Sequence, residues 1–186
     1  DPRRLRPAAS LRGLGMSLTL TTARLTLRPP QPGDVAGYIA YAATARAEAL
    51  GGPHAAPRAW HDFTYQMGHW QMRGYGLFTV LRRDTTIPIG QVGPYFAEGL
   101  PEAELGWHLW SAADEGQGLA FEAANTARDF CHARLGWRSC VSYVPQGNLR
   151  SEALATRLGA VLAPAAATPE AGLRVYRHPL PQGAAA

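Results

Sequence analysis

A glycine-rich turn between a predicted strand and a predicted helix constrains this chain more than any other stretch. Aromatic and apolar residues dominate 103–110 and predict a strand. A short polar connection at 111–114 leads into Glu-Gly-Gln-Gly at 115–118, and apolar residues then recur at helical spacing through 119–134. Free backbone N–H groups converge where a glycine loop opens a helix, and the helix dipole adds partial positive charge. The sequence therefore predicts an anion-binding site at this loop.

The residues around the loop exclude two common nucleotide-binding motifs. A Walker loop ends in Gly-Lys-Ser/Thr, but the chain contains no lysine. A dinucleotide-binding fingerprint needs a third glycine where this chain has Phe121, and Asp129 lies too close to the loop to reach a ribose. Because no arginine lies between Leu105 and Arg128, we expect backbone amides rather than side-chain charge to hold the phosphate.

Hydrophobic periodicity along the rest of the chain predicts an α+β fold. Further helices are expected at 35–44, 56–72 and 149–158, and further strands at 22–28, 76–81, 87–96, 139–144, 161–162 and 173–177. The helix at 119–134 connects two of these strands, which should therefore run parallel. The helix at 56–72 is rich in aromatic residues, for which we favour core packing over a role as the wall of a substrate site.

Length and composition indicate a single globular domain at 16–180. The chain has 186 residues, of which 46% are hydrophobic and 17% are charged. Its formal charge of +4 comes with scattered arginines, which argues against a nucleic-acid partner. Cys131 and Cys140 form neither a zinc spacing nor a disulfide framework, so we expect no metal and a reducing, cytoplasmic location. No apolar run reaches membrane length, so we expect no membrane partner.

The two ends of the chain are expected to be loose. Residues 1–15 carry four arginines and two prolines without any period, which predicts a disordered leader. A basic arm that binds RNA is the alternative interpretation of this segment. Residues 181–186 are expected to form a loose tail.

The loop resembles the pyrophosphate loop of the GNAT N-acetyltransferase superfamily, which is written Gln/Arg-x-x-Gly-x-Gly/Ala. Gly118 and Ala120 fit the last two defined positions, whereas Glu115 departs from the first. The ribosomal-protein N-terminal acetyltransferases, or Rim-type branch, often lack Gln or Arg there too. Their sequence Gly-Arg-Gly-Tyr-Ala-Thr-Glu-Ala is closely matched by residues 116–123.

A second stretch resembles the other signature of the same superfamily. A predicted strand ends before Asn148-Leu-Arg-Ser151, and the helix that follows ends in Leu158-Gly159. By resemblance, Asn148 binds the pantetheine side of the cofactor and Ser151 faces the thioester sulfur. In the alternative interpretation Asn148 only caps the helix and Ser151 is an ordinary first-turn serine. Many members place a tyrosine acid further along this helix, but 149–159 contains none.

The resemblance implies a fold and a co-substrate. We expect a mixed, mostly antiparallel sheet of about seven strands with a splayed parallel pair, flanked by about four helices. Acetyl-CoA would place its pantetheine arm in the wedge between the splayed strands. There it would pair with the main chain of His108, Leu109 and Trp110. Its pyrophosphate would bind the loop residues Gly116, Gln117, Gly118, Leu119 and Ala120.

The expected reaction moves an acetyl group from acetyl-CoA to a primary amine by direct attack on the thioester. The acceptor is a small-molecule amine or a protein N-terminus, and the protein is a monomer or a homodimer. Glu104 lies eleven residues before Glu115, the first position of the loop. At the position of Glu104, some members of the superfamily carry a carboxylate that acts as the general base. Its side chain should share a strand face with Gly106 and His108, and partial burial beside Trp107 and Trp110 would raise its pKa.

Three alternatives remain open from the sequence. In one alternative, which the sequence supports equally, Glu104 is a solvated strand residue and not the base. His108 is the alternative base, although a single histidine beside tryptophans is more often structural. In the second function class the chain is a non-catalytic acyl-CoA-binding module, in which Glu104 and Ser151 are structural.

Overall fold

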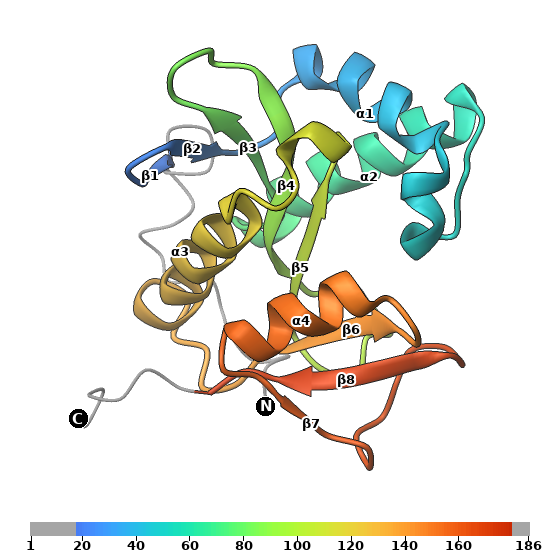
Figure 1. Cartoon of the computed structure of the whole chain (residues 1–186), viewed down its shortest axis with the longest axis vertical. Coiled ribbons are helices and arrows are strands. Elements are labelled where there is room, and N and C mark those ends of the chain that lie inside the picture. The colour runs from blue at the N-terminus through green and yellow to red at the C-terminus, as the bar shows by residue number, and fades with distance from the viewer. Residues whose placement is uncertain (1–17, 180–186) are drawn as a thin grey trace.

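The computed structural model describes residues 18–179 and contains one twisted eight-stranded sheet (Figure 1). The strand order across the sheet is β1-β2-β3-β4-β5-β6-β8-β7. The strands are β1 (Leu20–Thr21), β2 (Leu25–Arg28), β3 (Phe78–Arg82), β4 (Pro88–Tyr95), β5 (Glu104–Leu109), β6 (Val141–Pro145), β7 (Val161–Leu162) and β8 (Leu173–Arg177). The helices are α1 (Val35–Ala42), α2 (Ala56–Arg73), α3 (Leu119–Ala133) and α4 (Leu149–Arg157).

The helices cover the sheet in layers. The apolar face of α3 packs on one face of β2 to β5, where alanines on the helix allow close approach to Leu105 and Val92. On the opposite face of the sheet, the ring of Tyr41 in α1 stacks on His108 of β5, with 5.2 Å between ring centroids. Helices α1 and α2 share a smaller core that includes Tyr38 and Phe63. Helix α4 covers β6 and β8 (Figure 1).

All strand pairs are antiparallel except β5 with β6, which are parallel and diverge almost at once. Their register contains one pair, Glu104 with Val141. The N–H of Val141 donates to the carbonyl of Ala103 at 3.0 Å, and the Ser142 hydroxyl donates to the carbonyl of Leu105 at 2.6 Å. Beyond Leu105 the two strands separate. The predicted mostly antiparallel sheet with a splayed parallel pair is thus confirmed.

Two local features differ from the sequence prediction. The stretch 22–28 was expected to form one strand, but β2 begins only at Leu25. A turn at Thr22 separates it from an additional strand, β1, which lies before the predicted stretch and is the eighth strand of the sheet. The hydroxyl of Thr22 accepts from the N–H of Leu25 at 2.9 Å and so stabilises this turn. The second difference is a 3₁₀ helix, Ala45–Leu50, which follows α1 in a stretch for which no element was predicted. Short 3₁₀ turns leave no clear periodic signal.

A buried carboxylate ties the first helix to the sheet. Asp34 accepts two hydrogen bonds of 2.7 Å from Arg28, and others from the Gln31 N–H at 2.9 Å and the Thr79 hydroxyl at 3.0 Å. Burial alone would raise the pKa of Asp34, but these hydrogen bonds outweigh it and hold the pKa below its ordinary value. Asp34 thereby fixes the start of α1 against β2 and β3.

The remaining expectations concern the termini, cysteines and membranes. The leader at 1–15 and the tail at 181–186 both lie outside the described residues. Cys131 and Cys140 are buried and free. None of the helices in 18–179 is long and apolar enough to cross a membrane. Over the same range, no group of three or more His, Cys, Asp and Glu side chains is arranged to hold a metal ion.

Candidate active site

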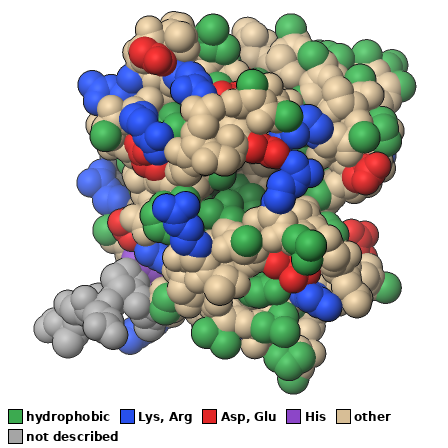
Figure 2. All heavy atoms as spheres, viewed as in Figure 1, with side chains coloured by type: hydrophobic (Ala, Val, Ile, Leu, Met, Phe, Trp, Pro, Cys, Tyr) green, Lys and Arg blue, Asp and Glu red, His purple; other side chains and the backbone are tan. Residues whose placement is uncertain are grey.

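Two cavities meet where β5 and β6 splay apart. The inner cavity, with a volume of about 460 Å³, lies between α2, β4, β5 and β6. The loop groove, of about 410 Å³, runs from the splay past the glycine loop and α4. Trp107, His108, Asn148 and Ser151 line both cavities. Figure 2 shows a hollow near the centre of this face, with hydrophobic side chains in its floor and arginines and carboxylates at its rim.

The glycine loop takes a backbone conformation that requires glycine. Gly116 and Gly118 have φ angles of 71° and 76°, in the left-handed region. A Cβ atom would meet nothing within 4 Å at Gly116, and only the guanidinium of Arg24, at 3.7 Å, at Gly118. Glycine is therefore required by conformation and not by crowding. Gly118 is the N-cap of α3 and makes no side-chain cap bond, which leaves the first helical N–H groups for a ligand.

Four of the five predicted loop residues line the groove, and one does not. Gly116, Gly118, Leu119 and Ala120 lie in its wall. Gln117 is absent from the lining, because its amide accepts from Arg82 at 3.0 Å and donates to the Ala113 carbonyl. Its own carbonyl accepts from Arg24 at 3.0 Å. Gln117 therefore braces the loop from outside.

Of the three residues predicted to pair with the cofactor arm, only Leu109 turns its main chain toward the wedge, and the pairing itself stays a prediction. Along a strand, the N–H and C=O groups of successive residues point to opposite sides. In β5 the main-chain groups of every second residue therefore face β4, and those of the residues between them face the wedge. The carbonyl of Leu105 bonds to Ser142 of β6, which puts Trp107 and Leu109 on the wedge side. The N–H of Trp110 donates to Ile89 beside β4 at 2.8 Å. The prediction is therefore wrong for Trp110, and the main chain of His108 also faces β4.

Arginines from distant parts of the chain surround the groove. Arg46 and Arg150 both bind the Glu115 carboxylate, at 2.6 and 2.5 Å, and all three residues line the groove. Arg46 also donates to the Leu109 carbonyl at 3.2 Å. Arg157 lies over the ring of Phe121, 4.2 Å from its centroid. The groove therefore carries side-chain charge that the local sequence did not indicate, because these arginines lie close in space and not in sequence. The expectation that backbone amides hold the phosphate stays a prediction.

Asn148 and Ser151 occupy the predicted helix start at the junction of the cavities. The Asn148 side chain accepts from the Ser151 N–H at 3.2 Å and caps α4. The indole N–H of Trp107 donates to the Ser151 hydroxyl oxygen at 3.3 Å. The serine oxygen is thus used as an acceptor while its own O–H remains available to donate.

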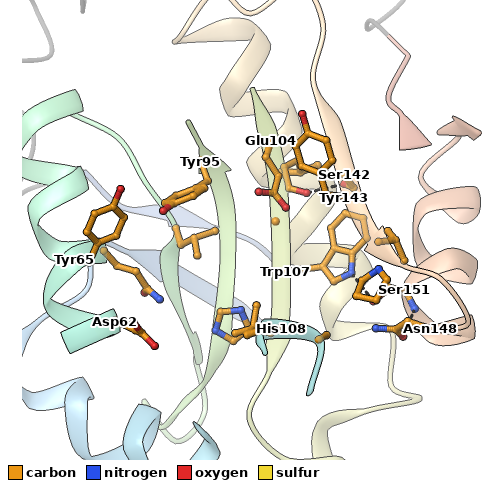
Figure 3. Close-up of a pocket in the computed structure, with 18 of the residues that line it drawn as sticks. Asp62, Tyr65, Tyr95, Glu104, Trp107, His108, Ser142, Tyr143, Asn148 and Ser151 are labelled. Carbon is orange, nitrogen blue, oxygen red and sulfur yellow. Dashed lines mark hydrogen bonds between the residues drawn. The ribbon is translucent and has the colours of Figure 1, made fainter. Parts of the chain in front are cut away.

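Glu104 faces the inner cavity from the start of the splay. Its Oε1 lies 3.7 Å from the position of a Cβ at Gly106, so the two share a strand face as predicted. Burial raises the pKa of Glu104 to about 7, although the nearby backbone N–H of Tyr143 acts in the opposite direction. Tyr95, Ser142 and Tyr143 stand around the carboxylate (Figure 3). Trp110 is not among its neighbours, contrary to expectation.

His108 is an uncharged wall residue. Its ring stacks on Tyr41, and its Nε2 lies 3.1 Å from Gln91 Oε1. Burial lowers the pKa of His108 to about 4, so the ring is neutral at neutral pH. Trp110 packs instead on α1, with its ring centroid 6.2 Å from that of Tyr38.

The α2 wall of the inner cavity was missed by the sequence prediction. Phe63 and Trp70 are buried core residues, as favoured for this helix. Asp62 and Tyr65, from the same helix, line the cavity on the side opposite Asn148 and Ser151 (Figure 3). The aromatic content of 56–72 was the only sequence feature that pointed to a cavity wall, and it did not distinguish residues that line the cavity from residues buried in the core. Tyr95 was missed too, because it lies in an ordinary strand pattern.

Comparison with known proteins identifies the family. The acetyltransferase (GNAT) domain matches residues 24–161. An acetyltransferase from Agrobacterium tumefaciens str. C58 is similar over 88% of this chain and 95% of that one, with 37% identity and a TM-score of 0.82.

Two structures at lower identity share the fold. RimL, a ribosomal L7/L12 alpha-N-protein acetyltransferase in complex with coenzyme A, is 17% identical over 88% of this chain and 98% of that one, with a TM-score of 0.70. The microcin C7 self-immunity acetyltransferase MccE, in complex with acetyl-CoA and AMP, is 15% identical over 86% and 94%, with a TM-score of 0.65. RimL belongs to the Rim-type branch that the loop resembles. By its domain match and its identity to the Agrobacterium protein, the chain belongs to the acetyltransferase (GNAT) family.

Proposed function

We propose that this protein transfers the acetyl group of acetyl-CoA to a primary amine by direct attack on the thioester. The observation that carries the proposal is the meeting of two cavities at Trp107, His108, Asn148 and Ser151. A transferase of this kind needs separate approaches for donor and acceptor that converge at the reacting atoms. The groove with the glycine loop suits the donor, and the inner cavity suits the amine.

The loop groove fits a pyrophosphate-bearing thioester. The open N-terminus of α3 supplies backbone donors, and Arg46 and Arg150 supply positive charge. The wedge side of β5 presents the main chain of Trp107 and Leu109 to an extended amide-bearing arm. Coenzyme A and acetyl-CoA in the RimL and MccE structures support the same co-substrate here.

The residues at the junction supply the proton transfers that the reaction needs. An ammonium has no lone pair, so the acceptor must lose a proton before its nitrogen bonds to the acetyl carbon. Glu104, with its pKa near 7, accepts this proton, directly or through water. The carbon–sulfur bond then breaks, and the Ser151 hydroxyl donates a hydrogen bond to the leaving thiolate. Thiols ionise near pH 8.5, so this last assistance is modest.

The test is release of free thiol from acetyl-CoA in the presence of a panel of primary amines. Amine-dependent release is expected, and it excludes a non-catalytic acyl-CoA-binding module. Glu104→Gln should depress the rate most near pH 7 and recover as the pH approaches the pKa of the acceptor. Its affinity for acetyl-CoA should be unchanged, because Glu104 is not in the loop groove. A wild-type pH–rate profile in the variant would show that the amine arrives already neutral and that Glu104 is not the base.

A further inference from the structure

The inner cavity has two acidic side chains on opposite walls. Glu104 projects from β5, and Asp62 projects from α2 on the far side from Ser151 (Figure 3). They are the only carboxylates in the described lining of this cavity. The proposed reaction uses one carboxylate, Glu104, and gives Asp62 no task.

Aromatic rings line the same cavity as these carboxylates. Tyr38, Tyr65 and Tyr95 line the cavity on the Asp62 side. Burial raises the pKa of the Tyr95 phenol most, Tyr65 adds to this effect, and the charges of Glu104 and Asp62 make smaller contributions in the same direction. Tyr95 therefore lies within electrostatic reach of both acids. Tyrosine faces attract cations, and a carboxylate beside them fixes where a cation settles.

The basic side chains of the lining, Arg58 and His61, are largely exposed to solvent, and the His61 Nδ1 lies 3.6 Å from Asp62 Oδ1. The Arg58 side chain is 65% exposed and that of His61 is 73% exposed. Arg58 approaches Asp62 through its Nε, at 2.7 and 3.0 Å from the two oxygens, as an i,i+4 pair on the helix surface. Exposed pairs of this type are weak. The pair orients the carboxylate and leaves further lone pairs on Asp62 for a ligand.

A second polar group on the same wall lacks a partner. Gln66 lies one helical turn beyond Asp62, lines the cavity, and is 9% exposed. Its Oε1 has no hydrogen-bond partner among the residues that the structure describes. A buried acceptor of this kind is costly unless a donor is supplied from elsewhere. The α2 wall thus offers acceptors on Asp62 and Gln66.

We infer that the acceptor is an amine that carries a second, cationic group, as an aliphatic diamine does, and that Asp62 binds this distal group. The inference rests on the proposed acetyl transfer and adds the class of acceptor. One ammonium gives up its proton to Glu104 and is acetylated, while the other keeps its charge beside Asp62 and the tyrosines. The balanced reaction consumes the ammonium and acetyl-CoA and yields the amide, the thiol and one proton.

The experiment compares three acceptors of equal chain length with the full-length protein. These are 1,6-diaminohexane, hexylamine and 6-aminohexanoate, and kcat/KM is measured from thiol release. The diamine should exceed hexylamine by about five- to tenfold, which corresponds to a partly exposed charge interaction. The amino acid should be the poorest, because its carboxylate would face Asp62. Preference for 6-aminohexanoate would overturn the inference and assign recognition to Arg58.

Asp62→Asn keeps the side-chain shape and removes the charge. It should lower kcat/KM for the diamine to about that of hexylamine, whereas kcat/KM for hexylamine should fall much less, and this remaining turnover also shows that the variant is folded. The matched control is Asp129→Asn, on the exposed side of α3, which should keep the preference for the diamine. Equal loss with both acceptors in Asp62→Asn would refute the distal site.

Other outcomes separate this inference from the proposed function. If all three acceptors are acetylated with the same kcat/KM, the acetyl transfer stands and the diamine inference fails. If none of the three is acetylated, the diamine inference also fails, and only the wider amine panel decides whether the protein transfers acetyl groups at all.

Discussion

Replacing Glu104 with glutamine should stabilise the folded protein at high pH. The pKa of Glu104 rises from its ordinary value of 4.5 to about 7 in the folded state. Between these values the folded protein binds a proton that the unfolded chain has lost, so stability falls as the pH rises through this window. Each unit of difference between the folded and unfolded pKa is worth about 1.4 kcal/mol, so above pH 7 the charged Glu104 lowers the free energy of unfolding by about 3 kcal/mol. Glutamine does not titrate and avoids this cost.

Urea denaturation at pH 5 and pH 8 measures the effect without any substrate. At pH 5 most of the cost is absent, so the stability gained by Glu104→Gln should grow by about 2 kcal/mol between pH 5 and pH 8. Glu102→Gln is the control, because its effect on stability should change with pH in the opposite direction. Hydrogen bonds of 2.6 and 2.8 Å from Arg177 lower the pKa of Glu102, so its stabilising effect is present at pH 8 and fades in acid.

The outcome that refutes the reasoning is a stability difference for Glu104→Gln that does not change with pH. It would mean that the carboxyl titrates near its ordinary value in the folded state. Glu104 would then be a poor base for an ammonium at neutral pH, and the proposed proton transfer would lose its support.

Three further predictions concern the loop, the junction and the fold. Gly118→Val should abolish the thermal stabilisation by acetyl-CoA, because valine resists a φ of 76°; equal stabilisation in both proteins would disprove the loop assignment. Ser151→Ala should lower kcat by about ten- to a hundredfold with near-normal acetyl-CoA affinity, whereas Asn148→Ala should weaken binding and cost about 1 kcal/mol of capping. Asp34→Asn should destabilise the protein by about 3 kcal/mol in urea denaturation, because it leaves Arg28 without its buried partner.

The parts of the site that were predictable from sequence are those fixed by local chemistry. Gly116 and Gly118 are required by backbone conformation, and Asn148 caps the helix that follows it directly. Each of these depends on a few neighbouring residues. The same holds for the parallel pair, because a single helix joins the two strands.

The parts that were missed depend on contacts across the sheet. Arg46 and Arg150 are far apart in sequence from each other and from most of the groove they line. The main-chain direction of Trp110 depends on which side of β5 pairs with β4, and a shift of one residue reverses it. Asp62 and Phe63 are adjacent in one helix, yet one faces the cavity and the other the core. The composition of the helix alone does not show which of its residues face the cavity.

Glu115 shows how a departure from the family pattern is compensated in space. The loop pattern has Gln or Arg at this position, whereas a carboxylate beside the proposed phosphate site would by itself repel the ligand. Here burial alone would raise the pKa of Glu115, but hydrogen bonds from Arg46 and Arg150 outweigh it and lower the pKa. The carboxylate stays ionised and holds two guanidinium groups at the groove, so its immediate surroundings carry a net positive charge. Positive potential at the loop consequently depends on the position of the 3₁₀ helix and of α4, which supply those arginines.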